Sequence, residues 1–145
     1  MAKRLTNRKI LITGGGAGIG RECVNQCIDE GATVAVLDQD INNLEGAIEK
    51  NGLANCILPI KVEISNLEQV ATGVEQAALK LKGLDGIVNS AGIDLFTSFD
   101  QMNWDDWNRI LAVNLSGAMH VCYQAIPYLK SSSHSSIVNI SSGAG

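Results

Sequence analysis

The alternation of short apolar runs with longer amphipathic segments is the feature that most constrains the fold of this chain. The short runs are apolar throughout rather than at every second position, which is typical of strands that are buried on both faces. Between the runs, apolar residues recur at the three- and four-residue spacing of a helix. This order predicts an α/β fold with a doubly wound parallel sheet, whose strands cover residues 9–13, 33–37, 56–62, 84–88 and 137–140.

Capping residues mark where the helices begin and end. Asp40 and Asn103 can each accept a hydrogen bond from a first-turn N–H group, and residues 65–68 have the form of a capping box that starts at Ser65. Glycine is the residue type that most often follows a helix, because it adopts a left-handed backbone without strain. We therefore expect the first three helices to be closed by Gly31, Gly52 and Gly83.

The helices between the strands should each bury one apolar face. Pro127 lies within the fourth of them and is expected to kink or end it, because proline lacks the backbone N–H group. The predicted buried faces are, in chain order, Ile19, Cys23, Val24, Cys27 and Ile28; Ile41, Leu44, Ala47 and Ile48; Leu67, Val70, Val74, Ala77, Ala78 and Leu81; and Trp104, Trp107, Ile110, Leu111, Ala118, Cys122 and Ala125.

Length and charge fit one domain with a small-molecule ligand. The chain has 145 residues, of which 46% are hydrophobic, and this is enough for a sizeable core. Its formal net charge of -4 provides no basic surface for nucleic acid. The basic residues near the N-terminus are not followed by a long apolar run, so neither a signal peptide nor a membrane anchor is expected. We predict a single cytoplasmic domain over residues 1–145, with no nucleic-acid or membrane partner.

The four cysteines do not have the spacing of a metal site. They lie at positions 23, 27, 56 and 122, and the two histidines are far apart in the sequence. No CxxC pair is present, which is the usual signal for a structural zinc ion. We interpret the cysteines as small buried apolar side chains in a reducing compartment, and we expect no metal.

A glycine cluster, "TGGGAGIG" at residues 13–20, joins the first strand to the first helix. Glycines there let backbone N–H groups approach a phosphate, and the helix N-terminus favours negative charge. A P-loop requires Lys and Ser or Thr after its last glycine, whereas Gly20 is followed by Arg21 and Glu22, which argues against ATP or GTP hydrolysis. A tight strand-to-helix turn without any ligand remains the alternative.

Two polar residues stand at positions that suit a nucleotide site. Asp38 ends the second strand, where a carboxylate can accept hydrogen bonds from both ribose hydroxyls of an adenosine. The alternative for Asp38 is a turn or a helix cap. Asn114 falls on the predicted apolar face of the fourth helix, where a buried amide must find a hydrogen-bond partner. Nearby backbone could also supply that partner.

Taken in order, five motifs resemble those of the short-chain dehydrogenase/reductase (SDR) family. Gly14, Gly18 and Gly20 give the spacing TGxxxGxG of that family's cofactor loop, in place of a literal GxGxxG. Asp38 is the second motif, and "NSAG" at 89–92 resembles the family's NNAG. The remaining two are "NLSG" at 114–117 and "IVNISS" at 137–142. The resemblance runs from about residue 5 to the end and implies a Rossmann-type sheet with strand order 3-2-1-4-5.

The resemblance also assigns roles to individual residues. Asn114 would hold a water in a proton relay, and Ser142, rather than Ser141, would hydrogen-bond the substrate oxygen; a serine-rich turn is the alternative for that segment. Glu63 departs from the Asp that the family usually carries there, although its carboxylate could still accept from an adenine amino group. The residues expected to bind the cofactor are Gly14, Gly16, Gly18, Ile19, Gly20, Asp38, Glu63, Ile64, Asn89, Ala91 and Gly92.

The family's general acid/base, a Tyr followed four residues later by Lys, has no match in this chain. Residue 127, four after Tyr123, is Pro, and residue 132, four after Tyr128, is Ser. The resemblance therefore implies a Rossmann sheet truncated after its fifth strand, as in the N-terminal part of a dehydrogenase. Residues 1–145 by themselves are expected to show no turnover, because the group that moves the proton is absent.

The predicted function is NAD-dependent oxidation and reduction of an alcohol/carbonyl pair by hydride transfer. NAD is favoured over NADP because the carboxylate of Asp38 would repel a 2′-phosphate. The resemblance further implies a homo-oligomer in the full-length form. One alternative is a methyltransferase, which also uses a glycine loop and an acidic residue after the second strand. Another is a non-catalytic dinucleotide-binding or interaction module.

Overall fold

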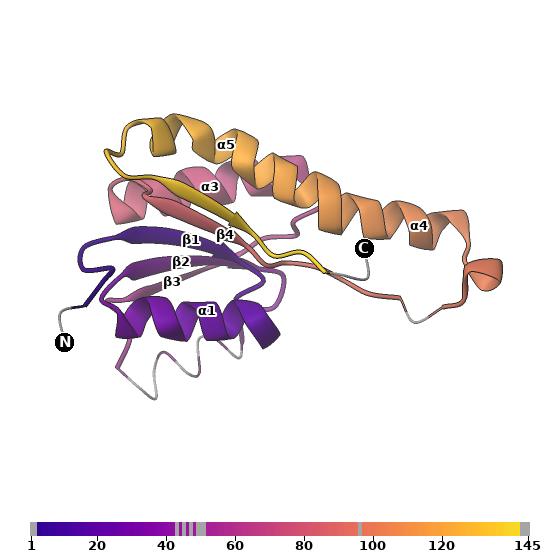
Figure 1. The fold of residues 1–145 in the computed structure, drawn as a ribbon, viewed down its shortest axis with the longest axis horizontal. Coiled ribbons are helices and arrows are strands. Elements are labelled where there is room, and N and C mark those ends of the chain that lie inside the picture. Colours follow the sequence, from indigo (N-terminus) through magenta and orange to yellow (C-terminus); the bar gives the residue numbers. More distant parts are fainter. Residues whose placement is uncertain are drawn as a thin grey trace.

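The computed structural model describes residues 3–142, apart from residues 43, 45, 47, 49–51 and 96. Five parallel strands form one sheet in the order β3-β2-β1-β4-β5, as Figure 1 shows, which confirms both the predicted α/β class and the predicted order. The strands lie within about two residues of the positions expected from the apolar runs. Their bounds are β1 Lys9–Thr13, β2 Thr33–Asp38, β3 Ile57–Lys61, β4 Gly86–Asn89 and β5 Ser136–Asn139.

Helices cover both faces of this sheet. Helix α1 packs on one face, and α3 and α5 pack side by side on the other (Figure 1). The described residues 42, 44, 46 and 48 are also helical, whereas Ala47 and Asn51 of the second predicted helix lie outside the described residues. The other described helices are α1 Gly18–Asp29, α3 Leu67–Leu81, the 3-10 helix η1 Phe99–Gln101, α4 Trp104–Leu111, the π-helical segment η2 Ala112–Gly117 and α5 Ala118–Lys130.

Two buried clusters, one on each face of the sheet, form the core. Successive strand residues point to opposite faces, so Leu11 belongs to one cluster and Ile12 to the other. The cluster under α3 and α5 includes Leu11, Val70, Val74, Ile87 and Val121. The cluster under α1 includes Ile12, Val24, Val34, Val36 and Leu44. Burial of the strands on both faces is what their continuous apolar runs predicted.

Two helix boundaries differ from the prediction by one residue. Helix α3 is capped by Asn66, whose side chain accepts from the backbone N–H of Gln69 at 3.0 Å, and not by Ser65. The Ser65 hydroxyl instead donates to the carboxylate of Glu63 at 3.0 Å, within the turn that precedes the helix. At the other end, Lys82 adopts the left-handed conformation before Gly83 does. The predicted ends at Gly31, with φ of 91°, and at Asn103 are confirmed.

Pro127 does not end its helix. Helix α5 continues through it to Lys130, and Ala125 and Leu129 on either side are buried in the core. This burial holds the two flanking turns against the sheet, which compensates for the one backbone hydrogen bond that proline removes. Of the two expected effects of Pro127, termination of the helix is therefore wrong, and a kink stays a prediction.

The predicted burial of the tryptophans is also wrong. Trp104 is 79% exposed and Trp107 is 41% exposed. Figure 1 shows the reason, because α4 extends beyond the edge of the sheet and has no strand beneath it. Ile19 and Leu67, the first apolar positions predicted for their helices, are likewise exposed. Periodicity identified an apolar face on α4, but no element of the described chain covers that face.

Candidate functional site

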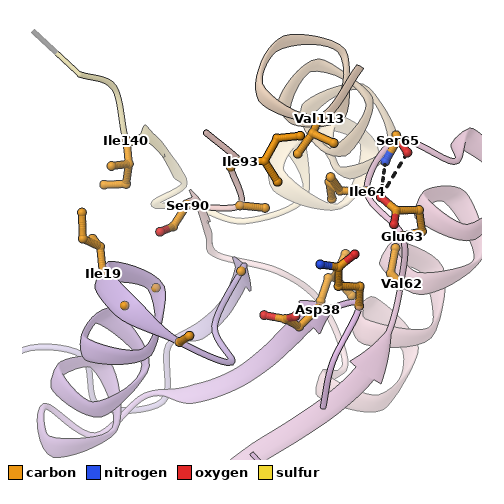
Figure 2. Close-up of a pocket in the computed structure, with 18 of the residues that line it drawn as sticks. Ile19, Asp38, Val62, Glu63, Ile64, Ser65, Ser90, Ile93, Val113 and Ile140 are labelled. Atoms are coloured by element: carbon orange, nitrogen blue, oxygen red, sulfur yellow. Dashed lines mark hydrogen bonds between the residues drawn. The ribbon is translucent and has the colours of Figure 1, made fainter. Parts of the chain in front are cut away.

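A cavity of about 430 Å³ opens at the carboxyl ends of the strands. It is bounded by the loops after β1, β2, β3 and β4 and by the helix that runs from α4 into η2 (Figure 2). In open α/β sheets this edge, at the point where the strand order reverses, is where ligands bind. Of the predicted site residues, those that line the cavity are Gly14, Gly18, Ile19, Gly20, Asp38, Glu63, Ile64, Ala91 and Gly92.

Gly14 and Gly20 are required by the packing of the loop itself. Gly14 has a positive φ of 68°, and a Cβ there would lie 2.7 Å from the backbone of Ala91. A Cβ on Gly20 would lie 2.2 Å from the carbonyl oxygen of Gly14. Neither position tolerates a side chain, with or without a ligand. These two glycines therefore fit the tight-turn interpretation as well as the phosphate interpretation.

Gly18 differs from the other two glycines. Its φ is 54°, and a Cβ there would meet no atom within 4 Å, so it would extend into open space at the cavity wall. The helix behind it begins at Gly18, and the capping residue Ala17 has no side-chain oxygen to accept from the first-turn N–H groups. The first turn of α1 thus presents backbone donors and a partial positive charge, which suits an anion.

Asp38 fastens the end of β2 to the glycine loop. One carboxylate oxygen accepts from the N–H of Gly16 at 2.8 Å, and the other accepts from the N–H of Asp40 at 3.0 Å. Gly16 does not line the cavity, and its place is against this carboxylate. Asp38 therefore performs the turn role that the sequence left as an alternative, while its half-buried side chain also lines the cavity.

The loop after β3 carries Glu63 at the cavity wall. Its carboxylate accepts from the hydroxyl of Ser65 at 3.0 Å and from the N–H of Ser65 at 3.4 Å, as the dashed lines in Figure 2 show. The N–H of Glu63 in turn donates to the side chain of Gln69 at 2.8 Å. Ile64 packs against the helix opposite, where a Cβ on Gly117 would lie 3.0 Å from its side chain. Glu63 stands where the family usually has Asp, and its carboxylate is hydrogen-bonded within its own turn.

Thr13 is a functional position that the sequence reasoning missed. Its hydroxyl oxygen accepts from the N–H groups of Ser90 and Ala91, at 3.1 and 3.0 Å, and the residue is 1% exposed. These bonds fix the loop after β4 against the end of β1. A threonine at the last position of a buried strand, directly before the glycines, was the available signal.

Asn89 supports the sheet rather than the cavity surface. It is buried and does not line the cavity. Its amide nitrogen donates to the side-chain oxygen of Asn139 at 2.8 Å and to the sulfur of Cys122 at 3.2 Å. Asn89 and Asn139 are paired in register on β4 and β5, so the amide ties the two strands together. The position of Asn89 is thus a structural one, and the cofactor contact expected of it stays a prediction.

Asn114 is exposed, and the expectation that it is buried is wrong. The buried neighbour is Val113, at 9% exposure. The π-helical segment η2 accommodates an extra residue per turn, which rotates Asn114 away from the core. The amide is nevertheless fully paired, because it accepts from the N–H of Ile93 and donates to the carbonyl of Ile93, both at 2.9 Å. The side chain therefore bonds to nearby backbone, which was the alternative for Asn114.

The two serines after β5 are exposed and do not line the cavity. Ile140, which precedes them, does line it, and its N–H donates to the carbonyl of Asn89 at 2.9 Å. The choice of Ser142 over Ser141 stays a prediction. Residues 143–145 lie outside the described residues.

Arg109 and Val113 also line the cavity and were not predicted to. They are four residues apart on the helix and therefore share a face. The signal was weak, since a charged residue at the edge of an apolar helix face usually points to solvent.

No group of three His, Cys, Asp or Glu side chains within the described part of the chain could hold a metal ion. The cysteines are free thiols, and burial together with the neighbouring Cys23 raises the pKa of Cys27. None of the helices that the structure describes is long and apolar enough to cross a membrane.

A glycine loop that enters a helix at the switch point of a 3-2-1-4-5 parallel sheet defines a Rossmann-like fold. Residues 8–145 match the family model described as short chain dehydrogenase, and the chain belongs to that family. Members of this family are oxidoreductases that use nicotinamide dinucleotides and act on small molecules, commonly as oligomers.

Curated relatives match almost the whole chain. It is 34% identical, over 98% of its own length, to the 3-oxoacyl-(acyl-carrier-protein) reductase FabG of Thermotoga maritima. It is 32% identical, over 100% of its length, to 2-(S)-hydroxypropyl-CoM dehydrogenase 3 of Xanthobacter autotrophicus. The chain spans 58% and 57% of the length of these two proteins.

A solved structure of a short-chain dehydrogenase/reductase from Brucella melitensis, described as a glucose/ribitol dehydrogenase, is similar over 99% of this chain. Its TM-score is 0.92 at 32% identity, and the similar part is 60% of that chain. The predicted family and its Rossmann-like sheet are thus confirmed.

Proposed function

We propose that the protein is an NAD-dependent oxidoreductase that interconverts an alcohol and a carbonyl by hydride transfer. The observation that carries this proposal is the cavity at the switch point, with Gly18 open to it on one side and the carboxylate of Asp38 on the other. A dinucleotide needs backbone donors for its pyrophosphate and an acceptor for its ribose hydroxyls. The helix turn that begins at Gly18 offers the donors, and the carboxylate of Asp38 offers the acceptor.

The residues present fit the cofactor along the length of the cavity. The first turn of α1, beginning at Gly18, would hold the pyrophosphate, and Asp38 the adenosine ribose. Glu63 and Ile64 would border the adenine, and Ala91 with Gly92 would lie beside the other half of the molecule. The bound dinucleotide supplies the hydride acceptor or donor.

The chain's own contribution to catalysis would be positioning. The amide of Asn114 holds the loop after β4 through both of its bonds to Ile93, which fixes one wall of the cavity. Ser142 would donate a hydrogen bond to the substrate oxygen. Proton transfer would need a further group, since no Tyr in this sequence is followed four residues later by Lys.

NAD is favoured over NADP by charge. Asp38 and Glu63 both line the cavity, and the only cation among the described residues that line it is Arg109 on the opposite wall. A 2′-phosphate next to Asp38 would meet like charge.

Titration of NADH and NADPH into the native polypeptide that contains these residues tests the proposal. We expect tighter binding of NADH, and we expect Asp38→Ala to narrow the difference between the two cofactors. Equal or tighter binding of NADPH by the unmodified protein would refute the preference, and binding of neither would refute the whole proposal.

A non-catalytic dinucleotide-binding module remains the second candidate, because it would share the entire cavity. Assay of the native polypeptide with NAD and a panel of alcohols separates the two. Turnover supports the enzyme, and cofactor binding without turnover supports the module. Membership of the dehydrogenase family leaves the methyltransferase alternative without support.

We further propose that the native protein is a homo-oligomer in the cytoplasm. A stripe along η1, α4, η2 and α5 exposes large apolar side chains, and a patch of this kind usually marks a contact between chains. The free thiols suit a reducing compartment. The exposed side chains of the stripe are Phe99, Trp104, Trp107, Leu115, Met119 and Tyr123.

A further inference from the structure

Among the described residues that line the cavity, Arg109 is the one cation. Neither a hydrogen bond nor an ion pair involves its side chain among the residues that the structure describes; the ion pair found there joins Arg4 to Glu30. The two carboxylates of the cavity are satisfied by other donors, Asp38 by backbone N–H groups and Glu63 by Ser65. The guanidinium is therefore available to a ligand.

The position of Arg109 on its helix places it at one end of the cavity. Arg109, Val113 and Gly117 lie on successive turns, and Gly117 packs directly against Ile64. Figure 2 shows Ile64 and Val113 close together at this end, beside Glu63, with Ile19 and Ile140 at the other end. Ile64 and Val113 are nearly buried side chains of the same core cluster, and where they line the cavity they give this end an apolar surface on which a flat ring can lie.

The charge at this end decides between two ligands for a guanidinium. A phosphate would be attracted to Arg109 but repelled by Asp38 and Glu63, which line the same cavity. A neutral aromatic base meets no such repulsion, and guanidinium groups stack on aromatic faces. Ile64 and Val113 add apolar contact for the base.

We propose that Arg109 binds the adenine base of the dinucleotide and helps to determine affinity for the adenosine half of the cofactor. This inference rests on the proposed function. Arg109 is exposed at the rim of the cavity, so its side chain closes over a base that has already entered rather than blocking its entry.

The experiment compares Arg109→Met with the control Lys130→Met in the native polypeptide. Lys130 is an exposed cation at the end of α5 that does not line the cavity, so both variants change the net charge equally. Dissociation constants are measured by calorimetry for three ligands: NADH, ADP-ribose and reduced nicotinamide mononucleotide, which lacks the adenosine. NADPH is titrated as well, to detect a contact with the 2′-phosphate. Thermal melting confirms that each variant is folded.

We expect Arg109→Met to weaken the binding of NADH and of ADP-ribose by about 2- to 30-fold, which is the range of a cation–π contact. The affinity for the mononucleotide should be unchanged. Lys130→Met should change none of the three. If the binding of all three ligands is weakened equally, the role of Arg109 is structural. If the binding of NADPH is weakened and that of NADH is not, Arg109 contacts a phosphate. Either result overturns the inference. If NADH binds normally to Arg109→Met, the inference fails while the proposed function stands. If the unmodified protein binds no dinucleotide, both fail.

Discussion

The central strand β1 and the outer helix α4 both present apolar side chains, yet their surroundings differ completely. Leu11 and Ile12 of β1 are 0% exposed, whereas Trp104 of α4 is 79% exposed. Strand β1 has a neighbour on each edge and helices over each face, while α4 projects beyond the sheet (Figure 1). The comparison teaches that an apolar pattern identifies which face needs cover but not whether the same chain supplies the cover.

Strand β5 is intermediate between β1 and α4 in the exposure of its apolar side chains. It pairs with β4 along one edge, and Ile137 and Val138 are 37% and 47% exposed. An apolar strand with an open edge readily pairs with a further strand. We therefore expect residues 1–145, if produced alone, to self-associate, which a solution mass measurement would reveal; a stable monomer would contradict this.

The largest effect is expected at the centre of the sheet. Leu11→Ala would leave a cavity in the cluster beneath α3 and α5 and should lower the free energy of unfolding by about 3–5 kcal/mol. Leu79→Ala is the matched control, because Leu79 is 70% exposed, and should change it by less than about 0.5 kcal/mol. Urea denaturation measures both. If the two variants lose similar amounts of unfolding free energy, burial does not explain the difference between the core and the surface.

The glycine loop should show the next largest effect. In Gly20→Ala the new Cβ would lie 2.2 Å from a backbone oxygen, so we expect unfolding to become easier by about 2–3 kcal/mol and NADH binding to be lost. Denaturation and calorimetry together measure the two losses.

Gly18→Ala provides the contrast within the same loop. The new Cβ meets no protein atom, so the cost should be about 1 kcal/mol of backbone strain. Because it extends into the cavity, binding of NADH should still weaken at least about tenfold, which is 1.4 kcal/mol. A folded Gly18→Ala protein that binds NADH normally would contradict the phosphate role of the loop.

The outer helix should respond through association instead of folding. Trp104→Ala should leave the stability of the isolated subunit within about 0.5 kcal/mol but weaken self-association by about 2 kcal/mol, as for a buried aromatic anchor. Sedimentation analysis of the native polypeptide over a concentration series measures this. If the variant loses subunit stability and keeps its mass, α4 is covered within one chain and the comparison drawn above is wrong.

The smallest effect is expected at a surface ion pair. The hydrogen bond and charge of Arg4, 2.9 Å away, hold the pKa of Glu30 below its ordinary value. A carboxyl with a lowered folded-state pKa contributes stability above its unfolded pKa and loses that contribution as the pH falls through the folded one. Glu30→Gln should therefore melt slightly below the unmodified protein at pH 7, and the difference should vanish in acid. The control is Glu75→Gln at an exposed position on α3, which removes a carboxylate that forms no ion pair within the described residues and should leave the melting temperature at pH 7 nearly unchanged.

The sheet could be predicted because its signals are local. The apolar runs, the positive φ of Gly31 and the cap at Asn103 each depend on a few neighbouring residues, and they were correct. The bonds of Thr13 to Ser90 and Ala91 could not be predicted, since they join segments far apart in the sequence.

The site was predicted less completely than the sheet for a related reason. Motif spacing identified the residues of the loops, but Arg109 belongs to a helix face that looks solvent-directed until the opposite wall is in place. Asn114 was assigned to a buried stripe by regular α-helical spacing, which the π-helical segment interrupts. Periodicity assumes a uniform helix, and here the departure from uniformity falls at the residue of interest.

The strand order also has a consequence for synthesis on the ribosome. Ile10 pairs with Val34 on one side and with Gly86 on the other, so β1 is made early but gains its second partner much later. At translation rates of roughly 5–20 residues per second, the stretch from Val34 to Gly86 takes about 3–10 s to make. During that time β1, which is buried on both faces in the finished sheet, has one edge without a partner. The nascent chain is therefore expected to depend on chaperones mainly between the emergence of β2 and that of β4.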